Sequence, residues 1–131
     1  MALPGLITAL ALILYLVTIV NVGRARAKYK IKPPATTGNE QFERVFRVQQ
    51  NTMEQLVLFL PSLWMNAVFF NPLMASLLGA VWLVGRAIYI RSYSRPTGNR
   101  MPGFIIGMSA TFLLLLSALA IILYGLIRSL F

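Results

Sequence analysis

The polar side chains best placed to do chemistry in this chain lie at the start of a long apolar segment. In the stretch FERVFRVQQNTMEQ, residues 42–55, Arg47, Asn51 and Glu54 recur at intervals of four and then three residues. On a helix that begins near the start of this stretch, such spacing places the three side chains on one stripe. Because charge beside hydrocarbon costs kilocalories per group, these side chains either lie at the water boundary or hold a polar partner.

A second set of arginines and tyrosines lies near the predicted ends of the other helices. Arg86, Tyr89 and Tyr93 repeat the helical spacing, Arg100 stands where a further apolar segment begins, and Arg26 where the first one ends. All four predicted helix ends therefore present guanidinium or phenol groups at a similar depth. The arginines greatly outnumber the carboxylates at this level.

This surplus of arginines indicates an anionic ligand. The alternative is an ion pair between Glu54 and a neighbouring arginine that only stabilises the fold, but such a pair leaves the surplus unexplained. From Arg47 to Glu54 the helix rises by roughly 10 Å, which is about the length of an extended tripeptide. We therefore expect an elongated anionic ligand with one cationic group. Glutathione has this charge pattern and carries a thiol, which the protein lacks.

The elements that must position these residues are predicted to be transmembrane helices. Of the 131 residues 58% are hydrophobic and 11% charged, which is too apolar for a soluble domain of this size. Residues 1–23 and 103–127 carry no charged side chain, and each run is long enough to cross ~30 Å of hydrocarbon. Two more apolar segments span residues 51–70 and 73–90, separated by an Asn71–Pro72 turn. We predict an all-α fold: an integral membrane four-helix bundle that forms one domain over residues 1–131.

The absence of cysteine and histidine restricts the chemistry. It excludes disulfides, a thiolate nucleophile, serine–histidine catalysis, and metal sites built on thiolate or imidazole ligands. We expect no metal, and any reaction must use a cofactor or co-substrate brought from outside.

The distribution of basic residues argues against nucleic-acid binding, despite a net charge of +9. Seven lysines and arginines lie between residues 24 and 47 and four between residues 86 and 100, whereas Arg128 lies near the other end of the fourth segment. In an up-and-down bundle the first two regions lie on the same side of the membrane. The positive-inside rule then places this side in the cytosol and both termini opposite. Topology alone explains much of this charge.

The chain resembles a known family over nearly its whole length. The resemblance to the membrane-associated proteins in eicosanoid and glutathione metabolism (MAPEG) is densest in KPPATTGNEQFERVFRVQQNTMEQ and GRAIYIRSYSRPTGNR. Within the family, the chain is most similar to the microsomal glutathione transferase and cysteinyl-leukotriene synthase branch. The resemblance implies a homotrimer of four-helix subunits, with one glutathione in each subunit interface on the cytosolic side. The host membrane would be a bacterial inner membrane or the endoplasmic reticulum.

The resemblance also implies the roles of individual residues. Arg100 matches the residue that stabilises the reactive thiolate, since a nearby guanidinium favours the charged form of a thiol whose ordinary pKa is ~8.5. The positions implied to contact glutathione are Arg26, Arg47, Gln49, Asn51, Glu54, Arg86, Tyr89 and Tyr93.

Departures from the family's pattern refine the expected function. The leukotriene synthases have a tyrosine at the position of Gln55 and an arginine at that of Ala27, so leukotriene-specific activity is in doubt. We predict a glutathione transferase that conjugates the thiolate to hydrophobic electrophiles and also reduces lipid hydroperoxides. One alternative is a non-catalytic lipid-presenting scaffold of the same family, against which the retention of Arg100 argues. Another is a small multidrug exporter, whose cationic substrates a rim of arginines would repel.

Overall fold

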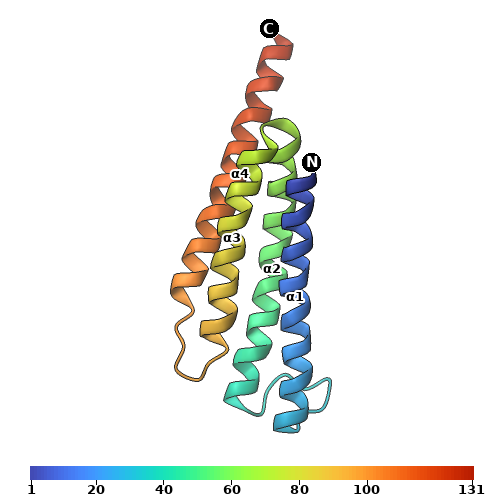
Figure 1. Cartoon of the computed structure of the whole chain (residues 1–131), viewed down its shortest axis with the longest axis vertical. Helices are drawn as coiled ribbons and strands as arrows, with labels where there is room; N and C mark the ends of the chain where they lie inside the picture. The colour runs from blue at the N-terminus through green and yellow to red at the C-terminus, as the bar shows by residue number, and fades with distance from the viewer.

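The computed structural model describes all residues 1–131, and these form four helices joined by short loops (Figure 1). The predicted all-helical fold with four helices is confirmed, and the structure contains no strands. Every helix extends beyond the apolar segment that predicted it, because polar first or last turns continue the same helix. The helices are α1 (Ala2–Tyr29), α2 (Glu40–Phe69), α3 (Pro72–Tyr93) and α4 (Met101–Leu130).

Asparagine caps define where two of these helices begin. The Asn39 side chain accepts a hydrogen bond from the Phe42 backbone N–H at 3.0 Å, so α2 starts well before its apolar portion. Asn71 does the same for α3, accepting from the Leu73 N–H at 2.8 Å, and Pro72 occupies the first helical position. The predicted turn at Asn71–Pro72 is therefore confirmed.

Three of the four helices, α1, α3 and α4, are long and apolar enough to cross a membrane. The prediction of four apolar spans thus holds for three, because α2 carries charges in its first half and polar side chains along its buried face. With 30 residues, α2 is nevertheless about 45 Å long. It lies alongside the other three helices over most of their length (Figure 1). The outer faces of α1 and α4 are apolar, as contact with lipid requires; they expose Leu6, Ile13, Leu16, Phe112, Leu116 and Leu119.

The helices run up and down, so the bundle has two chemically different ends (Figure 1). Both chain termini lie near one end, where α4 projects beyond its neighbours, and the α1–α2 and α3–α4 loops lie at the other end. Helices α2 and α3 contact each other, and each also contacts α1 and α4, whereas α1 and α4 do not contact one another. The polar residues of α2 and α3 therefore belong to the central pair of helices.

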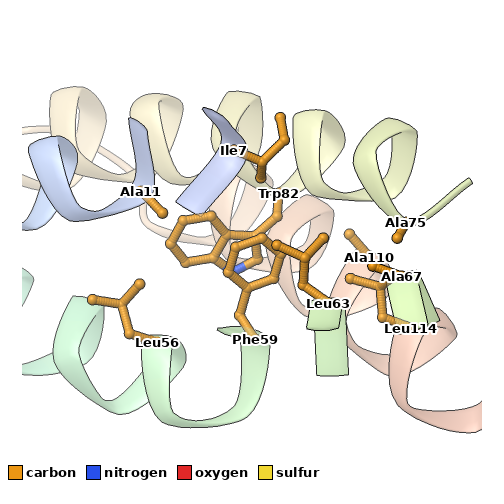
Figure 2. Close-up of a cluster of buried hydrophobic side chains, with 10 residues drawn as sticks. All are labelled: Ile7, Ala11, Leu56, Phe59, Leu63, Ala67, Ala75, Trp82, Ala110 and Leu114. Atoms are coloured by element: carbon orange, nitrogen blue, oxygen red, sulfur yellow. The ribbon is translucent and has the colours of Figure 1, made fainter. Parts of the chain in front are cut away.

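An aromatic stack joins this central pair. Phe59 of α2 and Trp82 of α3 lie parallel, with ring centroids 4.1 Å apart and an angle of 3° between their planes. Both side chains are fully buried, and Figure 2 shows Ile7 and Ala11 of α1 packed beside them. Since Arg86 follows Trp82 by one helical turn, the stack also determines which part of α2 faces Arg86.

Glycines bring α3 and α4 into direct backbone contact. A Cβ atom added at Gly85 would lie 2.7 Å from the Gly107 nitrogen, and one added at Gly103 would lie 2.7 Å from the Gly85 carbonyl oxygen. Close approach of this kind is characteristic of small residues at membrane helix interfaces. The contact places the start of α4, and with it Arg100, beside the last turns of α3.

Candidate functional site

The centre of the candidate site is a fully buried guanidinium. Arg86 has no exposed surface, and its Nη1 donates to Asn51 Oδ1 at 2.8 Å and to Thr52 Oγ1 at 3.4 Å. The guanidinium carbon lies 4.3 Å from the Tyr89 ring centroid and 5.7 Å from that of Trp82. Its Nε and Nη2 have no hydrogen-bond partner, and no carboxylate pairs with it. A buried cation with neutral acceptors alone is costly, so this site favours an anion.

A salt bridge lies on the outer side of α2. Arg47 donates from both terminal nitrogens to the Glu54 carboxylate, at 3.1 and 3.3 Å, and the two side chains are 47% and 51% exposed. The predicted shared face of Arg47 and Glu54 is confirmed. Asn51, however, is buried and turned toward Arg86. Long side chains thus bridge the roughly 10 Å of helix between Arg47 and Glu54, and a ligand that binds both must replace this ion pair.

Two tyrosines of α3 connect the buried guanidinium to the loop end. The rings of Tyr89 and Tyr93 have centroids 5.6 Å apart, with Tyr89 buried and Tyr93 half-buried. Tyr89 packs in one apolar cluster with Val48 of α2 and Phe104 of α4, and the Arg86 guanidinium carbon lies 4.3 Å from its ring centroid. Residues from α2, α3 and the start of α4 therefore meet at Tyr89, whereas the binding of one ligand by the predicted site residues stays a prediction.

Two of the predicted site residues, Arg26 and Gln49, make no hydrogen bond with the other predicted site residues. Arg26 donates to the carbonyls of Ile31 and Ala35, at 3.4 and 2.7 Å, and lies 5.0 Å from the Phe42 ring centroid. It therefore holds the α1–α2 loop against α2. Gln49 is half-buried and makes no hydrogen bond through its side chain.

Arg100 occupies the N-cap position of α4 and is exposed. Its side chain makes no hydrogen bond, and the first turn is capped instead by Asn99, which accepts from the Met101 N–H at 3.0 Å. A free guanidinium and the N-terminal end of a helix both favour a negative charge. Arg100 is therefore available to an anion without first giving up another partner.

Sequence reasoning missed the polar contacts that shape this end of the bundle. Arg44 was predicted only as part of the topological charge, yet it donates to the carbonyls of Tyr93 and Gly98 on the α3 side. Thr52 was not predicted at all, although it shares the Arg86 guanidinium with Asn51. The one available signal was spacing, because Arg44 precedes Arg47 by a single helical turn. The structure contains no group of His, Cys, Asp or Glu side chains that could hold a metal.

Fold and site together define a bundle of long apolar helices with a cluster of guanidinium groups near its loop end. The sequence pattern of the MAPEG family matches residues 4–120. The chain belongs to this family, and its three apolar spans make it an integral membrane protein.

Several relatives cover most of the chain. A protein of Synechocystis sp., described as uncharacterized, is 56% identical over 123 residues, which are 94% of this chain and 90% of that protein. Human microsomal glutathione S-transferase 2 is 46% identical over 102 residues, or 77% of this chain and 69% of the human protein. Leukotriene C4 synthase of Cavia porcellus is 38% identical over 114 residues, or 87% of this chain and 76% of that enzyme.

The buried hydrogen bond between Asn51 and Arg86 leads to a stability prediction. The substitution Asn51→Leu keeps a similar side-chain volume but leaves the Arg86 guanidinium with only its longer hydrogen bond to Thr52. The loss of a hydrogen bond to a charged group should lower the free energy of unfolding by ~1.5–3 kcal/mol. Denaturant unfolding in detergent without added ligand would measure it. Asn21→Leu is the control, since Asn21 is half-buried without a hydrogen bond; equal effects of the two substitutions would contradict the role of Asn51.

Proposed function

We propose that this protein is a membrane-bound glutathione transferase. It would join the thiolate of glutathione to hydrophobic electrophiles that reach the site through the bilayer. Family membership and relatives named as a glutathione S-transferase and a leukotriene C4 synthase support glutathione-related transfer. The observation that carries the proposal is the buried Arg86, which has two unpaired nitrogens and no carboxylate partner.

The charges of glutathione match those of the site. Its two carboxylates suit the guanidinium groups of Arg26, Arg47 and Arg86, and its ammonium group suits the Glu54 carboxylate. The remaining proposed contacts are hydrogen bonds to Gln49, Asn51, Tyr89 and Tyr93. Binding requires the ion pair of Arg47 and Glu54 to open. Because both side chains are about half exposed, exchanging that pair for ligand contacts costs little.

In this mechanism Arg100 stabilises the thiolate. A thiol with its ordinary pKa of ~8.5 is mostly protonated at neutral pH, and a guanidinium within hydrogen-bond distance lowers that pKa. The thiolate sulfur then attacks the electrophilic carbon and forms a C–S bond, while the displaced electron pair leaves with the departing group. Catalysis would come from positioning and charge stabilisation, with no covalent bond to the protein and no metal. Reduction of a lipid hydroperoxide is a proposed second activity that consumes two glutathiones and yields an alcohol, water and glutathione disulfide.

The surroundings of Glu54 help to separate this function from a multidrug exporter. Coupling a proton to a cationic substrate needs a buried, available carboxylate. Glu54 is about half exposed and paired with Arg47. The lipid-presenting scaffold remains the second candidate, and turnover of glutathione separates the two.

We also propose a homotrimer in which each glutathione lies between subunits. The exposed side of α2 carries an ion pair and then, deeper along the same helix, exposed Val57 and Val68. Charged side chains at membrane depth usually face protein or water and not lipid. A second subunit packed against the exposed side of α2 would meet this requirement. The loop end would face the cytosol, since eleven of the twelve basic residues lie toward it.

The assembly can be tested by mass. Native mass measurement of the protein released from detergent should give three copies, and adding glutathione should stabilise that species. A stable monomer or dimer that still binds glutathione would contradict an intersubunit site.

Arg100 provides the test of the enzymatic mechanism. In Arg100→Ala, turnover at neutral pH should fall about tenfold or more, equivalent to ~1.4 kcal/mol of lost stabilisation. Thiolate absorbance near 240 nm, followed against pH, should show a raised pKa of the bound thiol, and higher pH should recover part of the rate. Arg100→Lys should keep some activity as a point charge without the directional hydrogen bonds. The control is Arg95→Ala, an exposed arginine of the same loop. If Arg100→Ala and this control have the same pH–rate profile, the proposal that Arg100 stabilises the thiolate is contradicted.

The ion pair on α2 gives a test of binding. Arg47→Ala and Glu54→Ala should each weaken glutathione binding by ~1.5–3 kcal/mol, as expected for charge-assisted hydrogen bonds. The double exchange Arg47→Glu with Glu54→Arg should restore the ion pair, and with it any stability that the pair supplies, but not the binding. Calorimetric titration with glutathione measures this directly. Full affinity in the exchanged protein would mean that the pair is structural only.

A further inference from the structure

One arginine outside the proposed ligand set fastens the α3–α4 loop to α2. Arg44 donates from Nε to the Tyr93 carbonyl at 3.2 Å and from Nη2 to the Gly98 carbonyl at 2.8 Å. Its guanidinium carbon also lies 4.9 Å from the centroid of the Tyr93 ring. A single side chain of α2 thus contacts both the last residue of α3 and the middle of the loop that follows.

A second side chain of the same helical turn strengthens the attachment. Gln41 donates from Nε2 to the Ser94 carbonyl. Together, Gln41 and Arg44 satisfy carbonyls of Tyr93 and Ser94, which lie at the end of α3 and have no intrahelical partner of their own. A guanidinium at this place also complements the negative end of the α3 dipole.

The loop itself is shaped to reach Arg44. A Cβ atom added at Gly98 would collide with the carbonyl group of Ser92, so the loop packs directly on the last turn of α3. A turn closed by the Gly98 N–H and the Arg95 carbonyl, at 3.1 Å, turns the chain back at this point. Glycine at position 98 is therefore needed for the close approach that presents its carbonyl to Arg44.

Arg100 depends on this attachment because nothing holds its side chain. It follows Gly98 by two residues, and its guanidinium is exposed without a hydrogen bond. Its position is determined by the backbone of the loop and by the packing of α4 on α3. The guanidinium of Arg44, by contrast, is held by two carbonyls and a ring, so its own position is fixed by contacts within the chain.

We propose that Arg44 is a positioning residue that holds loop 94–100 on α2 and thereby sets where Arg100 meets the thiolate. This inference rests on the proposed function. The simpler account is that Arg44 contributes topological charge or general stability. The two accounts differ in one measurable property, since general stability does not change the ionisation of a bound thiol.

The experiment compares Arg44→Ala with two related variants and a control. Arg44→Lys keeps the charge but loses the paired geometry. Gly98→Ala pushes the loop off α3 while leaving Arg44 intact, and it keeps the test available if Arg44→Ala fails to fold. Arg91→Ala removes an exposed arginine from the last turn of α3 and is the matched control. The wild type and each variant are titrated with glutathione, and thiolate absorbance near 240 nm is followed against pH.

We expect Arg44→Ala and Gly98→Ala to lower the thiolate fraction at neutral pH about threefold or more, through a raised pKa of the bound thiol. Their affinity for glutathione should change less than the thiolate fraction, because neither residue belongs to the proposed ligand contacts. The thiolate fraction of Arg44→Lys at neutral pH should lie between those of the wild type and Arg44→Ala. Arg91→Ala should match the wild type.

Proteolysis supplies a readout that needs no glutathione. Trypsin can cleave after Arg100 but not after Arg95, whose bond to Pro96 resists it. If Arg44 holds the loop, cleavage between Arg100 and Met101 should be about fivefold faster or more in Arg44→Ala and Gly98→Ala, since cleavage requires local opening.

The outcomes separate this inference from the function on which it rests. A wild type that forms bound thiolate, together with an Arg44→Ala protein that matches Arg91→Ala in thiol ionisation, would overturn the inference and leave the transferase intact. Cleavage between Arg100 and Met101 at the same rate in Arg44→Ala as in Arg91→Ala would overturn the inference independently. A wild type that binds glutathione without forming thiolate would overturn both.

Discussion

The constraint on which this structure depends is the burial of a guanidinium inside an apolar bundle. Arg86 cannot reach water, so its neighbours must supply hydrogen-bond acceptors and polarisable surfaces. Asn51 and Thr52 provide the acceptors, and aromatic rings lie close to the cation. This need explains why the buried face of α2 carries the polar residues Asn51 and Thr52. The acceptors are neutral, so the positive charge remains uncompensated, and the same feature that ties α2 to α3 makes the site attractive to an anion.

Two different kinds of packing hold the helices so that the charged residues meet. Between α2 and α3 a stacked aromatic pair fills the space, whereas between α3 and α4 glycines allow backbones to touch. The first contact aligns Asn51 with Arg86, and the second brings the start of α4 against Tyr89. Neither contact involves a charged group. The apolar body of the bundle thus acts as a rigid frame, and the loop end carries the chemistry that we propose.

The basic residues at the loop end do not share one task, although the positive-inside rule treats them alike. Arg26 and Arg44 are bound to loop carbonyls, and Arg47 is paired with a carboxylate. Arg86 is buried, and Arg100 alone of these five is exposed and makes no hydrogen bond. Their electrostatic roles therefore follow from their partners and not from their charge. Arg44 shapes the site through its carbonyl contacts, whereas Arg86 and Arg100 have unused donors for an anion. A ligand that binds Arg26 or Arg47 must share or replace the contacts that these two arginines already make.

The class of fold could be predicted from the amino-acid sequence alone, because uncharged runs long enough to cross a membrane indicate that lipid surrounds them. Helical spacing also placed Arg47 and Glu54 correctly on one face, since that relation lies within a single helix. The depth of Arg86, the inward direction of Asn51 and the role of Arg44 were decided by the tertiary structure. The hydrogen bonds that define them join residues 35 and 54 positions apart. Periodicity shows which residues share a helical face, but the direction of that face depends on how neighbouring helices pack and how loops close.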